Sequence, residues 1–266
     1  IVPVKINQFG EIDYEDLISK INSKTKLISL THMSNVTGTL IDFTRIRELR
    51  KKYNIPLLID GCQYVPHKKL DIKDLDPDFY VFSAHKLYGP SGLGILYIKD
   101  KWLELFSPYQ GGGSMIKDVE INKSTYASGF EKFEAGTPPI AQVIGLSASL
   151  DFLKNLDLDV IFKHEMFLHD YMLEKLKSFN EIDIYGNSKS KGAIISFNIK
   201  NGHYNDVALL LDKKNIAIRS GHHCAQPLMK YLDIKGAARA SFGVYNSQND
   251  VDYFIESLKS IIKILK

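Results

Sequence analysis

Short runs of apolar residues recur along the first half of the chain. Residues 26–31, 55–59, 79–82 and 92–98 are rich in Ile, Leu, Val, Phe or Tyr, which is typical of buried strands. Residues 43–53, after the first run, instead carry apolar side chains at a helical spacing. Alternation of strands with helices favours a largely parallel sheet covered by helices.

The second half of the chain has a different pattern. Residues 107–139 are rich in glycine and have little periodicity, which indicates a long functional or interfacial loop. A long helical stretch is expected from residue 139 to about 179, with a break near 155–159. Further strands are expected at 193–199 and 216–219, and further helices at 205–212 and 249–265.

These elements predict an α/β fold in two parts. Residues 1–150 are expected to form a large domain with a mostly parallel sheet, and residues 151–266 a smaller α+β domain.

Composition excludes several classes of protein. The 266 residues are 44% hydrophobic and 24% charged, with a net charge of +3 from interleaved acids and bases. We therefore expect no nucleic acid as a partner. No apolar run approaches the roughly 18 residues of a membrane span. Only two cysteines are present, Cys62 and Cys224, so a reducing, intracellular compartment is the default expectation.

Polar side chains gather where two of the predicted strands end. Asp60 and Gln63 follow one apolar run, and Ser83, His85 and Lys86 follow the next. In parallel sheets, ligands bind outside the carboxyl ends of the strands. Pyridoxal 5'-phosphate needs a carboxylate at its ring nitrogen and an amine for its aldehyde. Taken singly these residues would be surface groups, but together they favour a cofactor site.

A second group of candidates lies near the C-terminus. Cys224 follows Arg219 in a loop rich in glycine and histidine, where neighbouring cationic groups favour the nucleophilic thiolate. Two alternatives stay open: half of a zinc site, for which no further ligand at a suitable spacing is present, or a small apolar cysteine. Arg239 lies inside an apolar segment, so its partner is either a substrate carboxylate or an internal acid.

At this point the residues match a known family. The chain resembles cysteine desulfurases of the SufS type (group II), which are class-V aminotransferases of fold type I. The resemblance runs over essentially the whole chain, and its matching segments are Thr31–Gly38 (THMSNVTG), Asp60–Gln63 (DGCQ), Ser83–Lys86 (SAHK), Phe133–Pro138 (FEAGTP) and Arg219–Ala225 (RSGHHCA).

The resemblance implies a role for each cofactor residue. Lys86 would hold pyridoxal 5'-phosphate and move a proton, and Asp60 and Gln63 would face the ring nitrogen and the ring oxygen. Ser83 and His85 would bind the phosphate. No metal is implied.

The remaining roles concern the substrate and the assembly. Asn35 and Arg239 would bind the carboxylate of L-cysteine, Arg219 would line the entry, and Cys224 would take the sulfur as a persulfide for iron–sulfur cluster assembly. Thr137 would reach the phosphate of the neighbouring subunit in a homodimer. A SufE- or SufU-like protein would accept the sulfur.

The resemblance also leaves alternatives open. A selenocysteine lyase or another class-V enzyme would share most of these residues, and an incomplete chain would act only as an interaction module. Relatives carry an N-terminal region ahead of the point that matches Ile1, so we expect a fragment, a nicked product or one of two pieces. The compartment is expected to be a bacterial cytoplasm or a plastid-type organelle such as the apicoplast.

Overall fold

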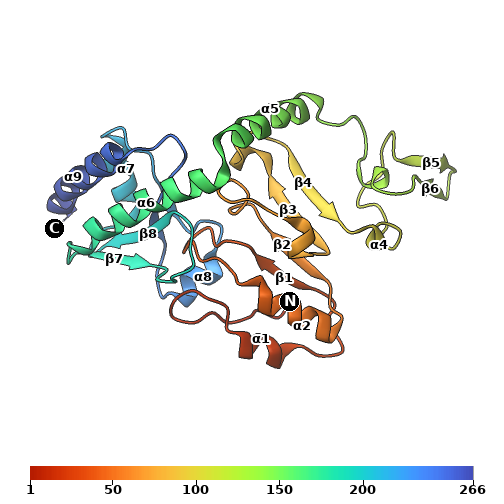
Figure 1. The fold of residues 1–266 in the computed structure, drawn as a ribbon, viewed down its shortest axis with the longest axis horizontal. Helices are drawn as coiled ribbons and strands as arrows, with labels where there is room; N and C mark the ends of the chain where they lie inside the picture. The colour runs from red at the N-terminus through yellow and green to blue at the C-terminus, as the bar shows by residue number, and fades with distance from the viewer. Residues whose placement is uncertain (266) are drawn as a thin grey trace. The chain divides into compact units, whose positions relative to one another are not determined.

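The computed structural model describes residues 1–265, and the chain divides into two compact units (Figure 1). Unit 1 contains residues 1–22, 33–42 and 157–265. Unit 2 contains residues 23–32 and 43–156. Each unit has its own four-stranded sheet.

A four-stranded sheet forms the centre of unit 2. Its strands lie in the order β1 (Ile28–Thr31), β2 (Leu57–Asp60), β3 (Phe79–Ser83) and β4 (Gly94–Ile98). The first three are parallel and β4 is antiparallel to β3. Helix α2 (Phe43–Tyr53) connects β1 to β2. The mostly parallel sheet predicted from the apolar runs is confirmed.

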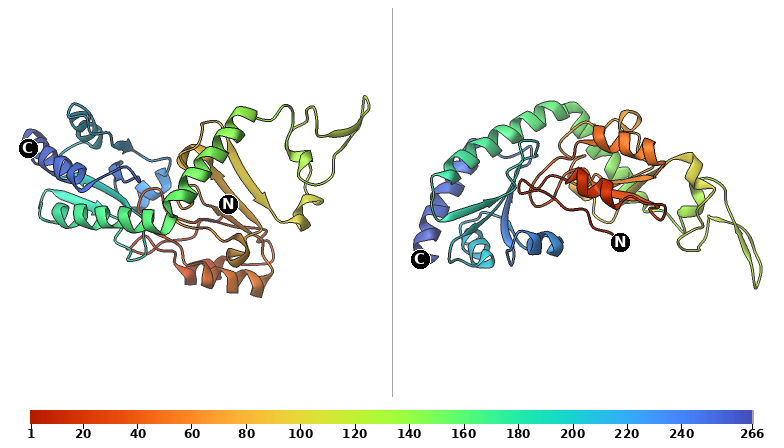
Figure 2. Two further views of the ribbon diagram at one scale, coloured as in Figure 1. Left: turned by 45° about the horizontal axis from the view of Figure 1, so that its top comes forward. Right: turned by 90° about the horizontal axis from the view of Figure 1, so that it is seen from below.

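The remaining elements of unit 2 are short, apart from one helix. They are α3 (Ile72–Leu75), η1 (Ala84–Lys86), α4 (Asp100–Leu103), β5 (Ile116–Val119), β6 (Ser124–Tyr126), η2 (Glu131–Phe133) and α5 (Ile140–Leu156). The segment predicted to be a loop thus contains the β5–β6 hairpin, which extends away from the four-stranded sheet (Figures 1 and 2). All four residues of β5 are exposed, so no alternation of apolar and polar residues marked the strand in the sequence.

Unit 1 is built on an antiparallel sheet in the order β7-β8-β10-β9. Helices α6 and α9 pack together, and a single apolar core fills the space between helices and sheet. The elements of this unit are α1 (Tyr14–Lys20), α6 (Leu158–Lys177), β7 (Ile182–Tyr185), β8 (Ile194–Ile199), α7 (Tyr204–Asp212), β9 (Arg219–Gly221), α8 (Gln226–Tyr231), β10 (Ala237–Ser241) and α9 (Gln248–Leu265).

The break predicted in the long helical stretch occurs at Asp157. This residue has a positive φ of 60°, and its side chain caps α6 by accepting from the backbone N–H of Asp159 at 3.0 Å. The predicted interruption near 155–159 is therefore confirmed.

The compact units differ from the predicted division at residue 150. The 33–42 segment belongs to unit 1 because it is hydrogen-bonded to residues far along the chain. Gly192 N–H donates to the carbonyl of Gly38 at 2.8 Å, and Ser196 Oγ donates to the carbonyl of Val36 at 2.6 Å. Such pairings leave no mark in the local pattern from which the division was predicted.

None of the helices within residues 1–265 combines the length and apolarity that a membrane crossing requires.

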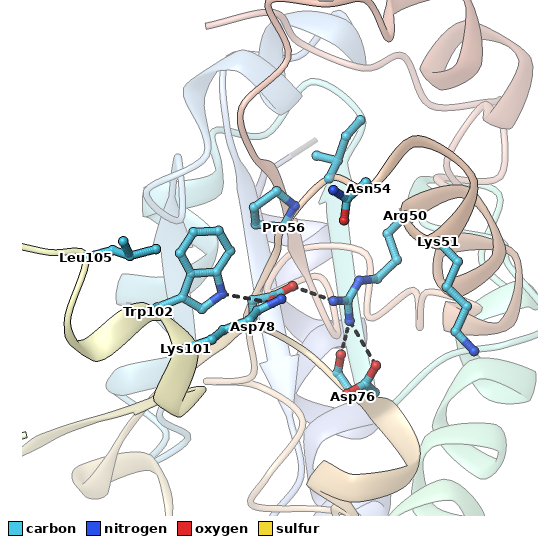
Figure 3. Close-up of a pocket in the computed structure, with 10 residues that line it drawn as sticks. Arg50, Lys51, Asn54, Pro56, Asp76, Asp78, Lys101, Trp102 and Leu105 are labelled. Atoms are coloured by element: carbon cyan, nitrogen blue, oxygen red, sulfur yellow. Dashed lines mark hydrogen bonds and ion pairs between the residues drawn. The ribbon is translucent and has the colours of Figure 1, made fainter. Parts of the chain in front are cut away.

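A buried carboxylate links several elements of unit 2 beside a cavity of about 450 Å³ (Figure 3). Asp78 is fully buried and accepts from Arg50 Nη2 at 2.6 Å, Trp102 Nε1 at 2.9 Å, the N–H of Leu57 at 3.0 Å and Lys101 Nζ at 2.9 Å. Burial alone would raise the pKa of Asp78, but these donors outweigh it and lower the pKa. Both carboxylate oxygens are occupied by protein donors, so the cluster serves the fold.

We expect Asp78→Asn to lower the free energy of unfolding by about 3 kcal/mol, because it removes the buried carboxylate from its ion pairs with Arg50 and Lys101. Urea titration at pH 7 would measure this. The lowered native pKa means that the stabilisation is present above the ordinary carboxyl pKa and is lost as the pH falls through the native value. The control is Asp74→Asn, which removes a pair between Arg47 and an exposed carboxylate. Equal stability losses in the two variants would contradict the account.

Candidate functional site

The structure brings the first group of candidates to one edge of the sheet in unit 2. Asp60 is the last residue of β2 and Ser83 the last residue of the parallel strand β3. His85 and Lys86 follow at once in the short helix η1. Because parallel neighbours end at the same edge, the acid and the amine share that edge.

Cys62 lies among these residues. Its N–H donates to Asp60 Oδ1 at 2.9 Å, and its Sγ lies 3.8 Å from Ser83 Oγ. Burial raises the pKa of the Cys62 thiol; the hydrogen bond and charge of Asp60 raise it further, while Ser83 and the charge of Lys86 oppose the increase. Cys62 is therefore a protonated thiol at neutral pH and it fixes the orientation of the Asp60 carboxylate.

A buried aromatic cluster supports the turn after Asp60. Tyr80 is fully buried directly beneath Gly61, where any β-carbon would overlap the tyrosine hydroxyl, so only glycine fits. Tyr80 Oη lies 3.0 Å from His32 Nδ1, and the N–H of His32 donates to the carbonyl of Asp60 at 2.7 Å. Tyr64 stacks on His32 with ring centroids 3.5 Å apart. Sequence reasoning missed this cluster.

Burial keeps the cluster neutral. It lowers the pKa of His32 to about 3, with a smaller contribution from the charge of Lys68, and it raises the pKa of Tyr80. The turn that carries Asp60 thus rests on an uncharged, hydrogen-bonded support.

The strand-end charges suit pyridoxal 5'-phosphate. Asp60 is exposed and Lys86 half-buried, and neither forms an ion pair with another side chain of residues 1–265. A carboxylate and an amine left unpaired at one edge fit a ligand that brings a protonated ring nitrogen and an aldehyde. The residues present therefore fit the group.

The other predicted cofactor residues are accessible. Gln63 is partly exposed in the turn after Asp60, and His85 is exposed. Thr137 is exposed and follows Gly136, whose φ is 85°. Within the described chain no hydrogen bond connects Thr137 to the strand-end residues, and its role toward a second subunit stays a prediction.

The second group of candidates lies together in unit 1. Strands β9 and β10 are antiparallel and place Arg219 directly opposite Arg239. Cys224 follows β9, is exposed, and has its Sγ 3.5 Å from Arg219 Nη2. The predicted strand at 216–219 is displaced, since β9 begins only at Arg219.

The backbone of the Cys224 loop is strained and is held in place by side-chain hydrogen bonds. His223 and Cys224 both have positive φ, 53° and 57°. His223 is buried, and its Nε2 donates to the carbonyl of Ala237 at 2.9 Å. Asn35 Nδ2 donates to the carbonyl of His223 at 2.6 Å, and Arg239 Nη1 donates to the carbonyl of Asn35 at 2.7 Å. Burial, with the charge of Arg239, lowers the pKa of His223 to about 4, so its ring is neutral.

Arg239 has capacity for an anion. Its Nε is buried without a hydrogen-bond partner, and the pKa of the guanidinium is lowered by burial and by the charge of Arg219 opposite. Like charges directly across a sheet repel each other. Arg239 forms no ion pair with an acid within residues 1–265. The internal salt bridge that the sequence left open is therefore absent from this part of the chain.

The zinc alternative for the loop gains no support. In the described part of the chain, no group of three or more His, Cys, Asp or Glu side chains is placed to hold a metal ion.

Comparison with known families decides the relationship. The family model described as Aminotransferase class-V matches residues 1–254. The chain belongs to the class-V aminotransferase family.

Curated class-V relatives are similar along almost the whole chain. A probable cysteine desulfurase of Halalkalibacterium halodurans is 44% identical over 250 residues, covering 94% of this chain and 61% of its own length. One from Staphylococcus epidermidis is 42% identical over 257 residues, covering 96% of this chain and 62% of its own length. The chain thus spans about three fifths of the length of these class-V relatives.

Solved structures of the family share the fold. The cysteine desulfurase CsdA (S-sulfonic acid) of Escherichia coli matches with a TM-score of 0.91 and 35% identity, over 96% of this chain and 63% of that one. The apo cysteine desulfurase of Thermococcus onnurineus matches with a TM-score of 0.92 and 35% identity, over 98% and 65%. The fold predicted from the resemblance to fold type I enzymes is confirmed.

Proposed function

We propose that this chain carries catalytic residues of a pyridoxal 5'-phosphate-dependent cysteine desulfurase. The observation that supports this most directly is the exposed thiol of Cys224 against the Arg219 guanidinium, with the unpaired Nε of Arg239 across the same strand pair. A thiol beside a site for a carboxylate is what removal of sulfur from an amino acid needs. Similarity to probable cysteine desulfurases supports the same reading.

The cofactor residues lie in unit 2. Lys86 would hold the aldehyde, Asp60 the ring nitrogen and Gln63 the ring oxygen, while Ser83 and His85 would bind the phosphate. When bound, pyridoxal 5'-phosphate supplies an electron sink for the α-carbon of the substrate. Asp60 is oriented for this task by the N–H of Cys62.

The substrate residues lie in unit 1. Arg239 offers its unpaired Nε to the carboxylate of L-cysteine, and Asn35 has a second amide hydrogen beyond the one that binds His223. Arg219 adds positive charge on the neighbouring strand, and its Nη2 lies 3.5 Å from Cys224 Sγ.

The reaction balances without an external oxidant or reductant. The Cys224 thiolate forms an S–S bond to the sulfur of L-cysteine, the C–S bond of the substrate breaks, and its electron pair remains with the carbon fragment. Lys86 moves a proton off the α-carbon and returns a proton to this fragment, which leaves as L-alanine. The sulfur remains on Cys224 as a persulfide.

Partners follow from the same proposal. A SufE- or SufU-like protein would take the sulfur toward iron–sulfur cluster assembly, inside a bacterial cytoplasm or a plastid-type organelle. A homodimer, with Thr137 reaching the phosphate of the neighbouring subunit, gains support from exposed apolar side chains on one helix. These side chains of α5 are Ile140, Val143, Ile144, Leu150, Phe152 and Leu156.

The identity of the product tests the proposal. We expect the natural full-length protein, loaded with cofactor and given L-cysteine and a thiol reductant, to form alanine and sulfide in equal amounts. Pyruvate and ammonia would instead indicate a lyase, and turnover of selenocysteine alone a selenocysteine lyase. A protein that binds no cofactor would be an interaction module. Each of these three results would contradict the proposal.

A further inference from the structure

We propose that Asn35 is a positioning residue for Cys224, and that its side-chain amide holds the cysteine loop in the conformation that places the thiol against Arg219. The inference deepens the proposed function and rests on it for the role of the thiol. The contact itself lies entirely within unit 1.

The contact is short and directed. Asn35 Nδ2 donates to the carbonyl of His223 at 2.6 Å, across 188 positions of sequence. His223 immediately precedes Cys224, so the amide holds the peptide group that joins the two residues. Asn35 is in turn fixed at its own carbonyl by Arg239 Nη1 at 2.7 Å. Arg239 therefore fixes Asn35, and Asn35 in turn fixes the loop that carries Cys224.

The loop needs such a restraint because its backbone is strained. His223 and Cys224 are both in the left-handed region, which side chains other than glycine adopt only where surrounding contacts hold them. Three contacts hold this pair: the Asn35 amide on the His223 carbonyl, the buried His223 ring on the carbonyl of Ala237, and the turn hydrogen bond from the N–H of Ala225 to the carbonyl of His222 at 2.9 Å. The Asn35 amide is the contact that holds the peptide group between His223 and Cys224 itself.

The chemical consequence concerns Arg219. Cys224 is exposed, so a released loop gains no access to reagents. In a released loop, Cys224 Sγ is no longer held 3.5 Å from Arg219 Nη2, the distance that the structure shows. The guanidinium at this distance attracts negative charge on the sulfur, and negatively charged sulfur is the reactive form. Loss of the Asn35 contact should therefore slow the reactions of the thiol, even without substrate.

The test is the rate at which iodoacetamide alkylates Cys224 in the full chain at pH 7, without L-cysteine. Peptide mass spectrometry separates Cys224 from Cys62, whose rate serves as an internal reference. Asn35→Asp keeps the shape but has no amide donor, and Asn35→Ala covers the case in which the carboxylate prevents folding. We expect both variants to slow alkylation of Cys224 about fivefold, the effect of losing one charge-assisted contact.

Two further variants separate positioning from loss of stability. Asn198→Ala removes a similar amide contact in unit 1, to the carbonyl of Gly236 at 2.8 Å, and should leave the alkylation rate within about twofold. Arg219→Gln should slow alkylation as much as Asn35→Asp does, and the double variant should be no slower than either single variant.

The outcomes of this test and of the product test are distinct. Alkylation of Cys224 at the parent rate in both Asn35 variants would overturn the inference, whatever the product analysis gives. An additive slowing in the double variant would also overturn it, because Asn35 would then act independently of Arg219. Failure to form alanine would overturn the proposed function alone, since the alkylation rates are measured without turnover.

Discussion

Lys86→Ala is expected to abolish formation of alanine from L-cysteine, with a fall of at least about 10³-fold, because the change removes the amine and the proton carrier together. The visible absorbance of bound cofactor should be lost on dialysis. Lys86 follows the end of β3 at the edge that carries Asp60, and no acid of the described chain forms an ion pair with it. The measurements are alanine release and the absorption spectrum after dialysis.

The control for this variant is Lys73→Ala, which removes an exposed lysine of α3 in the same unit. It should keep both the absorbance and the rate. Retention of dialysis-resistant absorbance by Lys86→Ala would show that another residue holds the cofactor.

Cys224→Ser should reduce alanine formation at least about 10²-fold and leave cofactor absorbance intact, because a serine hydroxyl does not supply the thiolate that attacks sulfur. The cofactor residues belong to unit 2 and Cys224 belongs to unit 1. The variant should therefore lose alanine formation and keep the absorbance of the bound cofactor. Alanine release and absorbance, measured on the same sample, test this separation.

The informative comparison is Cys62→Ala, which removes the other thiol. Burial raises the pKa of the Cys62 thiol, so this thiol is a poor nucleophile at neutral pH. The Cys62→Ala variant should therefore still form alanine. An inactive Cys62→Ala together with an active Cys224→Ser would reverse the assignment of the nucleophile.

Local patterns were sufficient for much of the fold. The helix predicted over residues 43–53 is α2 itself, because its apolar residues recur at a helical spacing. The strand ends at Asp60 and Ser83 were found because each closes an apolar run. The hairpin at 116–126 was not found, because exposed strands carry no alternating pattern.

Long-range contacts account for what the sequence did not predict. The bond from Arg239 to Asn35 joins residues 204 positions apart, and the pair of His32 and Tyr80 joins residues 48 apart. Neither pairing has a periodic or spacing signature. Gly61 was the one available signal for the aromatic cluster, since a glycine between Asp60 and Cys62 marks close approach of another group.

The mass of the peptide that contains Cys224 after a single turnover tests directly whether this cysteine takes the sulfur. The natural full-length protein, loaded with cofactor and treated with one equivalent of L-cysteine, is quenched with an alkylating agent and digested. We expect this peptide to gain the mass of one sulfur atom, the Cys62 peptide to gain none, and Lys86→Ala to show no gain at either cysteine. Alanine released in stoichiometric amount with no added sulfur on the Cys224 peptide would contradict this expectation.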